Sequence, residues 1–244
     1  MFKRILITAC YTGAIAALLL TLVQSLWISP LILKAELLEN AEATHEHVQT
    51  QQAHSHAAAE HIHDSKAWSP EDGWQRTLFT FGGNLVVAIG FALILCALYN
   101  LRAPTKVWHG VLWGAAGYVT FCLAPAAGLP PEMPGSVAAD LSSRQEWWGA
   151  TAFVTAAGLA LLAFGNHWLW RSVALLAILA PHVVGAPQPL EHHSVVPAEL
   201  LAQFQLASLS LNAVFWMVLG GLSCRMFRKE NAGAAPLDGI NSLA

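Results

Sequence analysis

The chain has 244 residues, of which 55% are hydrophobic and only 11% are charged, and its mean hydropathy is +0.49. Soluble domains carry about 25% charged residues, so this composition indicates an integral membrane protein. The net charge of −3 and the lack of a basic cluster exclude nucleic acid as a partner. We therefore expect an all-α, polytopic protein whose main partner is the lipid bilayer.

The first apolar run covers residues 5–28 and follows Lys3 and Arg4. It is long enough to cross about 30 Å of hydrocarbon at about 1.5 Å per residue. A signal peptide has a shorter apolar core that ends in small residues, whereas Trp27 and Pro30 occur here. Residues 1–28 are therefore predicted to form a retained N-terminal transmembrane helix.

A polar loop is predicted next, over residues 29–76. Its centre holds six of the chain's eleven histidines as three His-x-His pairs: His45, His47, His54, His56, His61 and His63. Imidazole binds first-row divalent metals and is mostly neutral near pH 7, so this His tract is typical of a metal collector. Residues i and i+2 point the same way on an extended chain but not on a helix, which favours a loose chelating arm. A solvated linker without metal is the alternative.

Five further apolar runs follow, and they predict a bundle of about five helices within residues 77–224. The expected spans are 77–99, 108–129, 147–164, 172–186 and 200–224. The run at 172–186 is short for a crossing, which leaves five spans as the alternative to six. Residues 225–244 are predicted to form a cytoplasmic tail.

Basic residues predict the orientation, because short cytoplasmic loops are enriched in Lys and Arg. With six spans and the N-terminus inside, both termini are cytoplasmic and eight basic residues share that side. They are Lys3, Arg4, Arg102, Lys106, Arg171, Arg225, Arg228 and Lys229. The His tract, the turn around Glu132 and the segment around His182 then share the outer face.

Two candidate metal ligands lie beside prolines. Glu132 follows Pro131 in a stiff turn that would present its carboxylate at the membrane edge, as a metal ligand or as a solvated loop acid. His182 follows Pro181 within an apolar run, and an ionisable group at membrane depth indicates a functional site. A histidine hydrogen-bonded to a neighbouring helix is the alternative for His182.

A third candidate cluster lies in the last outer loop, where His192 and His193 stand near Glu191 and Glu199. Adjacent residues of an extended chain point in opposite directions, so the two histidines need not bind one ion.

Other residues of the spans are predicted to serve packing. Gly82, Gly83 and Gly90 suit close helix contacts, and the amides of Gln24, Asn84 and Asn212 suit hydrogen bonds between helices. Packing is also expected of His109, His167 and the four isolated cysteines Cys10, Cys96, Cys122 and Cys224.

The chain has no phosphate-binding loop and no H-E-x-x-H motif. We therefore expect that the protein is not an enzyme. The ion that it transports would move down its own gradient, with the membrane potential, or with the help of another subunit.

Four motifs follow one another along the chain. They are Trp68-x-Pro70-x-Asp72-Gly73-x-Gln75-Arg76-Thr77, Ala124-Pro125-Ala126-x-Gly128-Leu129-Pro130-Pro131-Glu132-x-Pro134-Gly135, Arg144-Gln145-x-Trp147-Trp148 and Pro181-His182-x-x-Gly185-Ala186-Pro187. This series resembles the CbtA family of predicted cobalt transporter subunits. The resemblance implies a bacterial inner-membrane protein linked to cobalt supply for cobalamin synthesis, often with a small one-span CbtB partner. Within these motifs, the resemblance implies that Glu132 and His182 are the positions able to bind metal. It also implies that other polar positions shape the site or hold the outer loops together, namely Asp72, Arg76, Asp140, Arg144 and Gln145.

The sequence thus predicts a transporter of divalent cobalt whose His tract captures the ion and whose outer site admits it. Ni²⁺ and Zn²⁺ suit the same ligands. The alternative is a membrane-anchored accessory subunit that delivers ions to a separate translocator, and a homo-oligomer is compatible with either function.

Overall fold

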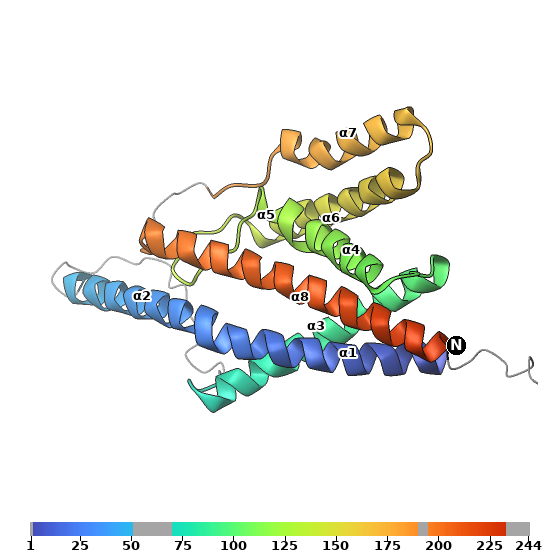
Figure 1. The fold of residues 1–244 in the computed structure, drawn as a ribbon. Helices are drawn as coiled ribbons and strands as arrows, with labels where there is room; N and C mark the ends of the chain where they lie inside the picture. Colours follow the sequence, from blue (N-terminus) through green and yellow to red (C-terminus); the bar gives the residue numbers. More distant parts are fainter. Residues whose placement is uncertain (1, 51–69, 190–194, 233–244) are drawn as a thin grey trace, which may run out of the picture.

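The computed structural model describes residues 2–50, 70–189 and 195–232, without the side chains of 42–50 and 232. The elements of these residues are all helical (Figure 1), which confirms the all-α class. They are α1 (Phe2–Val23), the π-helical turn η1 (Gln24–Ile28), α2 (Ser29–Thr50), α3 (Trp74–Leu101), α4 (Val107–Tyr118), the π-helical turn η2 (Val119–Leu123), α5 (Ala124–Ala126), α6 (Leu141–Phe164), α7 (Trp168–Val184) and α8 (Ala198–Ala232).

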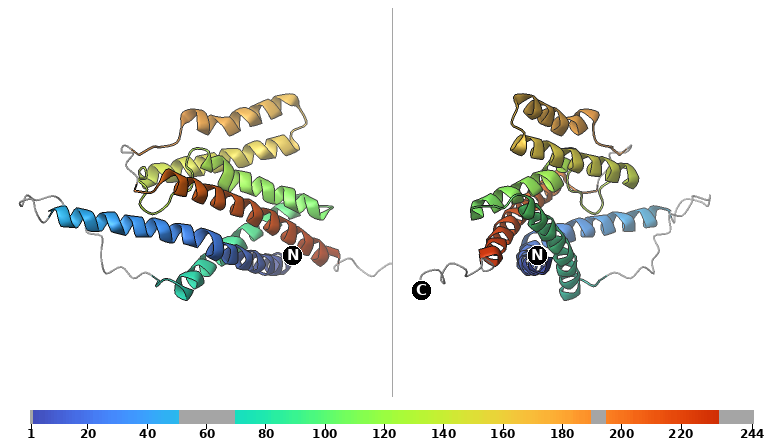
Figure 2. Two further views of the ribbon diagram at one scale, coloured as in Figure 1. Left: turned by 60° about the vertical axis from the view of Figure 1, so that its left-hand side comes forward. Right: turned by 90° about the vertical axis from the view of Figure 1, so that its right-hand side faces the viewer.

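Five stretches of the described chain are long and apolar enough to cross a membrane, so the protein is polytopic. They are Phe2–Ala41, Trp74–Leu101, Val107–Ala126, Leu141–Phe164 and Ala198–Asn231. The apolar helix α7 is shorter, with 17 residues and a length of about 25 Å. It runs back along α6 (Figures 1 and 2), so it reverses the chain direction as a sixth span would.

The helices share two ends (Figure 1). At one end lie the start of α1, the end of α8 and the short connections 102–106 and 165–167, and we call it the terminal end. At the other lie the starts of α3, α6 and α8 and the end of α7, together with residues 127–140, 185–189 and 195–197. We call this second end the loop end.

The first helix differs from the prediction, because it does not stop at residue 28. Helix α2 continues directly from η1 and projects beyond the bundle at the loop end (Figure 1). Leu31 and Ile32 pack on the core and Ala35 is fully buried, so residues after 28 still have an apolar side. The predicted polar loop therefore begins with a helix.

Both π-helical turns end two residues before a proline. Ser29 N–H donates to the carbonyl of Gln24, five residues earlier, just before Pro30. Ala124 N–H donates likewise to Val119 just before Pro125. A proline clashes with the carbonyl four residues before it in a regular helix, and the wider turn moves that carbonyl aside. The helix therefore passes through Pro30, and Pro125 lies within the final turn of its span.

Small residues hold α1, α3, α4 and α8 in one bundle. Ala9 and Ala17 of α1 and Ala88 and Ala92 of α3 are 0% exposed. A Cβ on Gly220 of α8 would collide with the Gly110 carbonyl of α4. Such close approach lets helices pack where lipid removes the hydrophobic driving force.

The glycines predicted for this role are different ones. Outside the local backbone of α3, no described atom lies within 4 Å of a Cβ built at Gly82, Gly83 or Gly90, so the prediction of close packing there is wrong. All three lie on the exposed side of α3.

Of the amides predicted to bond between helices, those of Asn84 and Gln24 do so, whereas that of Asn212 bonds within its own helix. Asn84 Nδ2 of α3 donates to Thr21 Oγ1 at 2.9 Å and to Gln24 Oε1 at 2.6 Å, which joins α3 to the first helix. Asn212 Nδ2 instead donates to the Ser208 carbonyl of its own helix. Cys96 and Cys224 are buried, in keeping with a packing role.

Helices α6 and α7 form a hairpin beside the bundle (Figures 1 and 2), and α7 packs mainly on α6. A Cβ on Gly158 of α6 would lie 2.6 Å from Ile178 Cγ1 of α7, and Ala174 is 0% exposed in the same contact. The hairpin reaches the bundle toward the loop end through η2 and α5, with Phe121 and Trp148 ring centroids 6.3 Å apart. It also meets α4 at the terminal end of α6, where the Phe164 and Trp113 ring centroids are 6.3 Å apart.

Candidate functional site

Most of the predicted histidine ligands lie outside the described residues. This is true of His54, His56, His61, His63, His192 and His193. The backbone of His45 and His47 belongs to α2, which differs from the loose arm expected there.

Glu132 lies in the turn after α5, and its carboxylate forms an ion pair with Arg144 in the first turn of α6. The distance between Arg144 Nη2 and Glu132 Oε2 is 2.6 Å, and the side chains are 28% and 33% exposed. Arg144 Nε is buried and has no partner in the described part of the chain. The pair ties the proline-rich turn to the hairpin.

Asp140 starts the helix that presents Arg144. Its carboxylate accepts from Ser143 N–H at 3.0 Å and from Ser143 Oγ at 3.1 Å, which makes it the N-cap of α6. The hydroxyl of Ser142, followed by these Ser143 donors, lowers the pKa of Asp140 below its ordinary value, because each bond favours the charged carboxylate. The cap is thus ionised at neutral pH.

His182 lies in the last turn of α7, half-buried beside Trp147 of α6. The two ring centroids are 5.9 Å apart in an edge-on arrangement. Trp147 Nε1 donates to the Pro181 carbonyl at 3.3 Å, and a Cβ on Gly128 would collide with the Trp147 ring. Trp147 therefore joins the turn after α5, the start of α6 and the end of α7.

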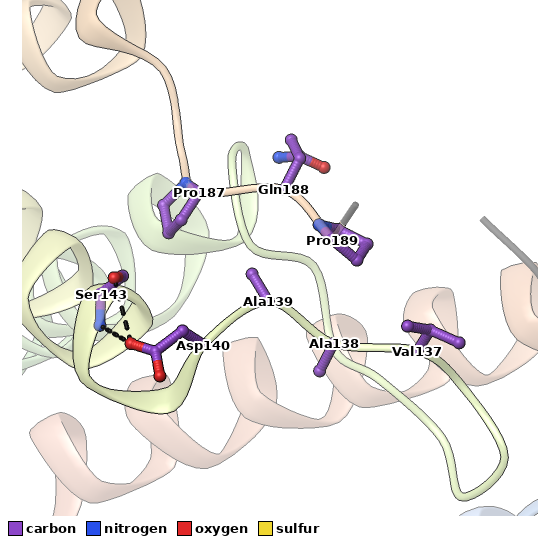
Figure 3. A pocket seen from close by; sticks show the side chains of 8 residues that line it. All are labelled: Val137, Ala138, Ala139, Asp140, Ser143, Pro187, Gln188 and Pro189. Atoms are coloured by element: carbon purple, nitrogen blue, oxygen red, sulfur yellow. Dashed lines mark hydrogen bonds between the residues drawn. The ribbon is translucent and has the colours of Figure 1, made fainter. Parts of the chain in front are cut away.

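The loop after α5 and the segment after α7 also meet in a pocket of about 460 Å³ at the loop end (Figure 3). Its lining is mostly small or apolar, and its polar groups are those of Asp140, Ser143 and Gln188. The lining residues are Val137, Ala138, Ala139, Asp140, Ser143, Pro187, Gln188 and Pro189. The Asp140 carboxylate already accepts hydrogen bonds as the N-cap of α6. The pocket therefore provides space at the loop end but no free carboxylate for a metal ion.

A second ion-pair cluster joins α2 to the start of α3. Arg76 Nη2 lies 2.6 Å from Glu36 Oε1, and Arg76 Nη1 lies 2.9 Å from Glu36 Oε2 and 2.9 Å from Asp72 Oδ1. This cluster fixes the helix that leads to the His tract against the bundle.

The described residues contain no group of three or more His, Cys, Asp or Glu side chains that could hold a metal ion. Glu132 and His182 are instead brought to the same part of α6, through Arg144 and Trp147, which are one helical turn apart. The two side chains therefore contact adjacent turns of α6 at the loop end.

Three contributors to this site had no predicted role. Trp147 and Gly128 stand in the quoted motifs, but their contact needs the fold to bring positions 128, 147 and 186 together. Glu36 lay in the predicted loop, where an acidic residue carries no sign of its partner. The apolar spacing of Ile28, Ile32 and Ala35 could have revealed the helix that presents Glu36.

The apolar helices and the motif residues gathered at one end define a multi-pass membrane protein with a polar cluster at its loop end. Residues 2–228 match the family described as "Probable cobalt transporter subunit (CbtA)". The chain belongs to this family, as the ordered motifs indicated. No curated protein and no solved structure matched the chain.

Proposed function

We propose that the chain carries Co²⁺ across the bacterial inner membrane and that the loop end is where the ion is admitted. The observation that carries the proposal is the family match over residues 2–228. The cluster in which Glu132 and His182 meet α6 supports it, because both are metal-binding side chains within motifs of that family.

The ion pair between Glu132 and Arg144 sets how the site would bind. An arriving cation competes with the Arg144 guanidinium for the same carboxylate, which weakens net binding. A transport site must hold its ion loosely enough to release it, so this competition suits passage rather than storage. Ni²⁺ accepts the same ligands and would compete with Co²⁺.

The loop end would face the periplasm. The eight basic residues predicted inside belong to elements of the terminal end, namely the start of α1, the connection between α3 and α4, the start of α7 and the end of α8. The His tract, which follows from α2, would then concentrate Co²⁺ on the outer side. Helix α2 is itself joined to the start of α3 by the ion pair of Glu36 with Arg76.

An accessory role is the second candidate, because the family description names a subunit. In that role the chain would collect Co²⁺ and pass it to a separate translocator, such as an assembly with a one-span CbtB-like protein or a homo-oligomer.

Proteoliposomes that contain only this chain separate the two. We expect Co²⁺ to accumulate inside them when a gradient is applied, and Glu132→Ala to reduce that uptake. Glu146→Gln is the matched control, since Glu146 is an exposed carboxylate two residues from Arg144. Binding without uptake by the wild type would exclude the stand-alone transporter.

A further inference from the structure

Two threonines on consecutive turns of α6 bury hydroxyls that bond to nothing in the described part of the chain. Thr151 and Thr155 are both 0% exposed, and neither Oγ1 has a hydrogen-bond partner there. A buried threonine of a helix commonly donates to the carbonyl four residues earlier, as Thr12 and Thr21 do at 2.7 and 2.8 Å. Thr8 is also unpaired, but the next threonine on its face is the paired Thr12.

The two threonines lie on the side of α6 that faces α7. Positions 147, 151, 155 and 158 are spaced by four, four and three residues, so they share one helix face. Both ends of this face contact α7: Trp147 Nε1 bonds the Pro181 carbonyl, and Gly158 meets Ile178. Thr151 and Thr155 therefore lie in the seam between α6 and α7.

Helix α7 adds an oxygen to the same seam. Pro181 lies inside α7 and has no N–H, so the carbonyl of Ala177 has lost its α-helical donor. Ala177 is one turn from both Ala174 and Pro181, which face α6. The seam thus contains two hydroxyls and one carbonyl without their usual helical partners. They lie on the side of His182 that faces the terminal end.

These oxygens lie deep in the membrane. At about 1.5 Å per residue, Thr151 and Thr155 are about 15 and 21 Å from the start of α6, near the middle of a span of about 36 Å. Unpaired polar groups at such depth are costly, and they are tolerated where they line a water-filled cavity. A purely structural seam would favour valine at both positions, since valine has the same shape and no hydroxyl to satisfy.

We infer that the half of the α6–α7 seam nearest the loop end opens into a hydrated passage, in which Thr151 Oγ1, Thr155 Oγ1 and the Ala177 carbonyl receive a partly hydrated divalent cation. The cation comes from Glu132 and His182, so the inference rests on the proposed function. The contact of Gly158 with Ile178 closes the passage on the terminal side. Helix α7 can separate in this way because α6 is its main packing partner, and because the residue that follows it, Gly185, has a φ of 88°, a conformation that favours glycine.

Accessibility to water tests the passage without reference to transport. Thr151→Cys and Thr155→Cys are expected to react with a small trimethylammonium methanethiosulfonate reagent added at the loop end, above the wild-type background, and Co²⁺ should slow the reaction. Thr12→Cys, equally buried but in the close-packed bundle, should stay unreactive. Labelling of Thr155→Cys no faster than of Thr12→Cys would overturn the inference.

Uptake tests the role of the hydroxyls. The double variant Thr151→Val/Thr155→Val is expected to bind Co²⁺ as before and to unfold at an equal or higher temperature, yet to take up Co²⁺ at least about tenfold more slowly, about 1.4 kcal/mol in barrier height. Thr8→Val/Thr12→Val, at two buried positions on consecutive turns of α1, should transport normally. Normal uptake by the first variant would overturn the role of the hydroxyls. If the wild type transports nothing, the proposed function fails, while the labelling still decides whether the passage exists.

Discussion

The contacts within the bundle differ in kind from the contacts that join the hairpin to it at the loop end. In the bundle, backbone meets backbone: Gly110 and Gly220 approach so closely that neither tolerates a Cβ. At the loop end, the hairpin meets the bundle through side chains, namely the Trp147 ring against Gly128 and the ion pair of Arg144 with Glu132. Side-chain contacts can adjust by changing rotamers, whereas backbone contacts change only when a whole helix shifts, so we expect the bundle to be the more rigid of the two regions.

The largest expected effect follows from the bundle. Gly220→Val should abolish folded protein in the membrane, because its Cβ would collide with the Gly110 carbonyl and with the backbone of Gly114, which are parts of α4 that no side-chain rotation can move aside. Gly82→Val is the matched control, since Gly82 faces open space on α3. The comparison is checked by the yield of monodisperse protein after detergent extraction. Equal yields of the two variants would show that the bundle is not held by this approach.

A smaller effect is expected where the hairpin meets the bundle. Gly128→Val would displace the Trp147 ring, a side chain that can turn aside, so the protein should still fold. Uptake of Co²⁺ should fall about threefold to tenfold, or about 0.7–1.4 kcal/mol, because Trp147 positions Pro181 and His182. Uptake and yield are measured on the same preparation. A loss of yield as severe as that of Gly220→Val would remove the distinction between the two regions.

The sequence was sufficient for the class and for the approximate spans, because uncharged runs of membrane length follow directly from composition. It was not sufficient for details set by contacts between distant residues. Gly82, Gly83 and Gly90 are as small as Gly110 and Gly220, and only the fold decides which of them meets another helix. Pro30 was expected near a helix end, but the π-helical turn before it lets the helix continue.

The candidate site shows the same limit. Glu132 and His182 could be identified from their chemistry and from the family motifs. Their contacts with Arg144 and Trp147 could not be predicted from the sequence. Thr151 and Thr155 could not be recognised from the sequence, because whether a buried hydroxyl has a hydrogen-bond partner depends on the positions of its neighbours in the fold.

The most direct test of the central claim compares three variants for Co²⁺ uptake across a range of concentrations. Glu132→Ala and His182→Ala should reduce uptake even at saturating Co²⁺, because each removes a proposed ligand of the site that would admit the ion. Replacing all six tract histidines should impair uptake mainly at low Co²⁺, since a collector only raises the local concentration. His109→Ala, at the terminal end, is the control. Loss of transport at saturating Co²⁺ in the tract variant alone, with Glu132→Ala and His182→Ala unaffected, would contradict the account.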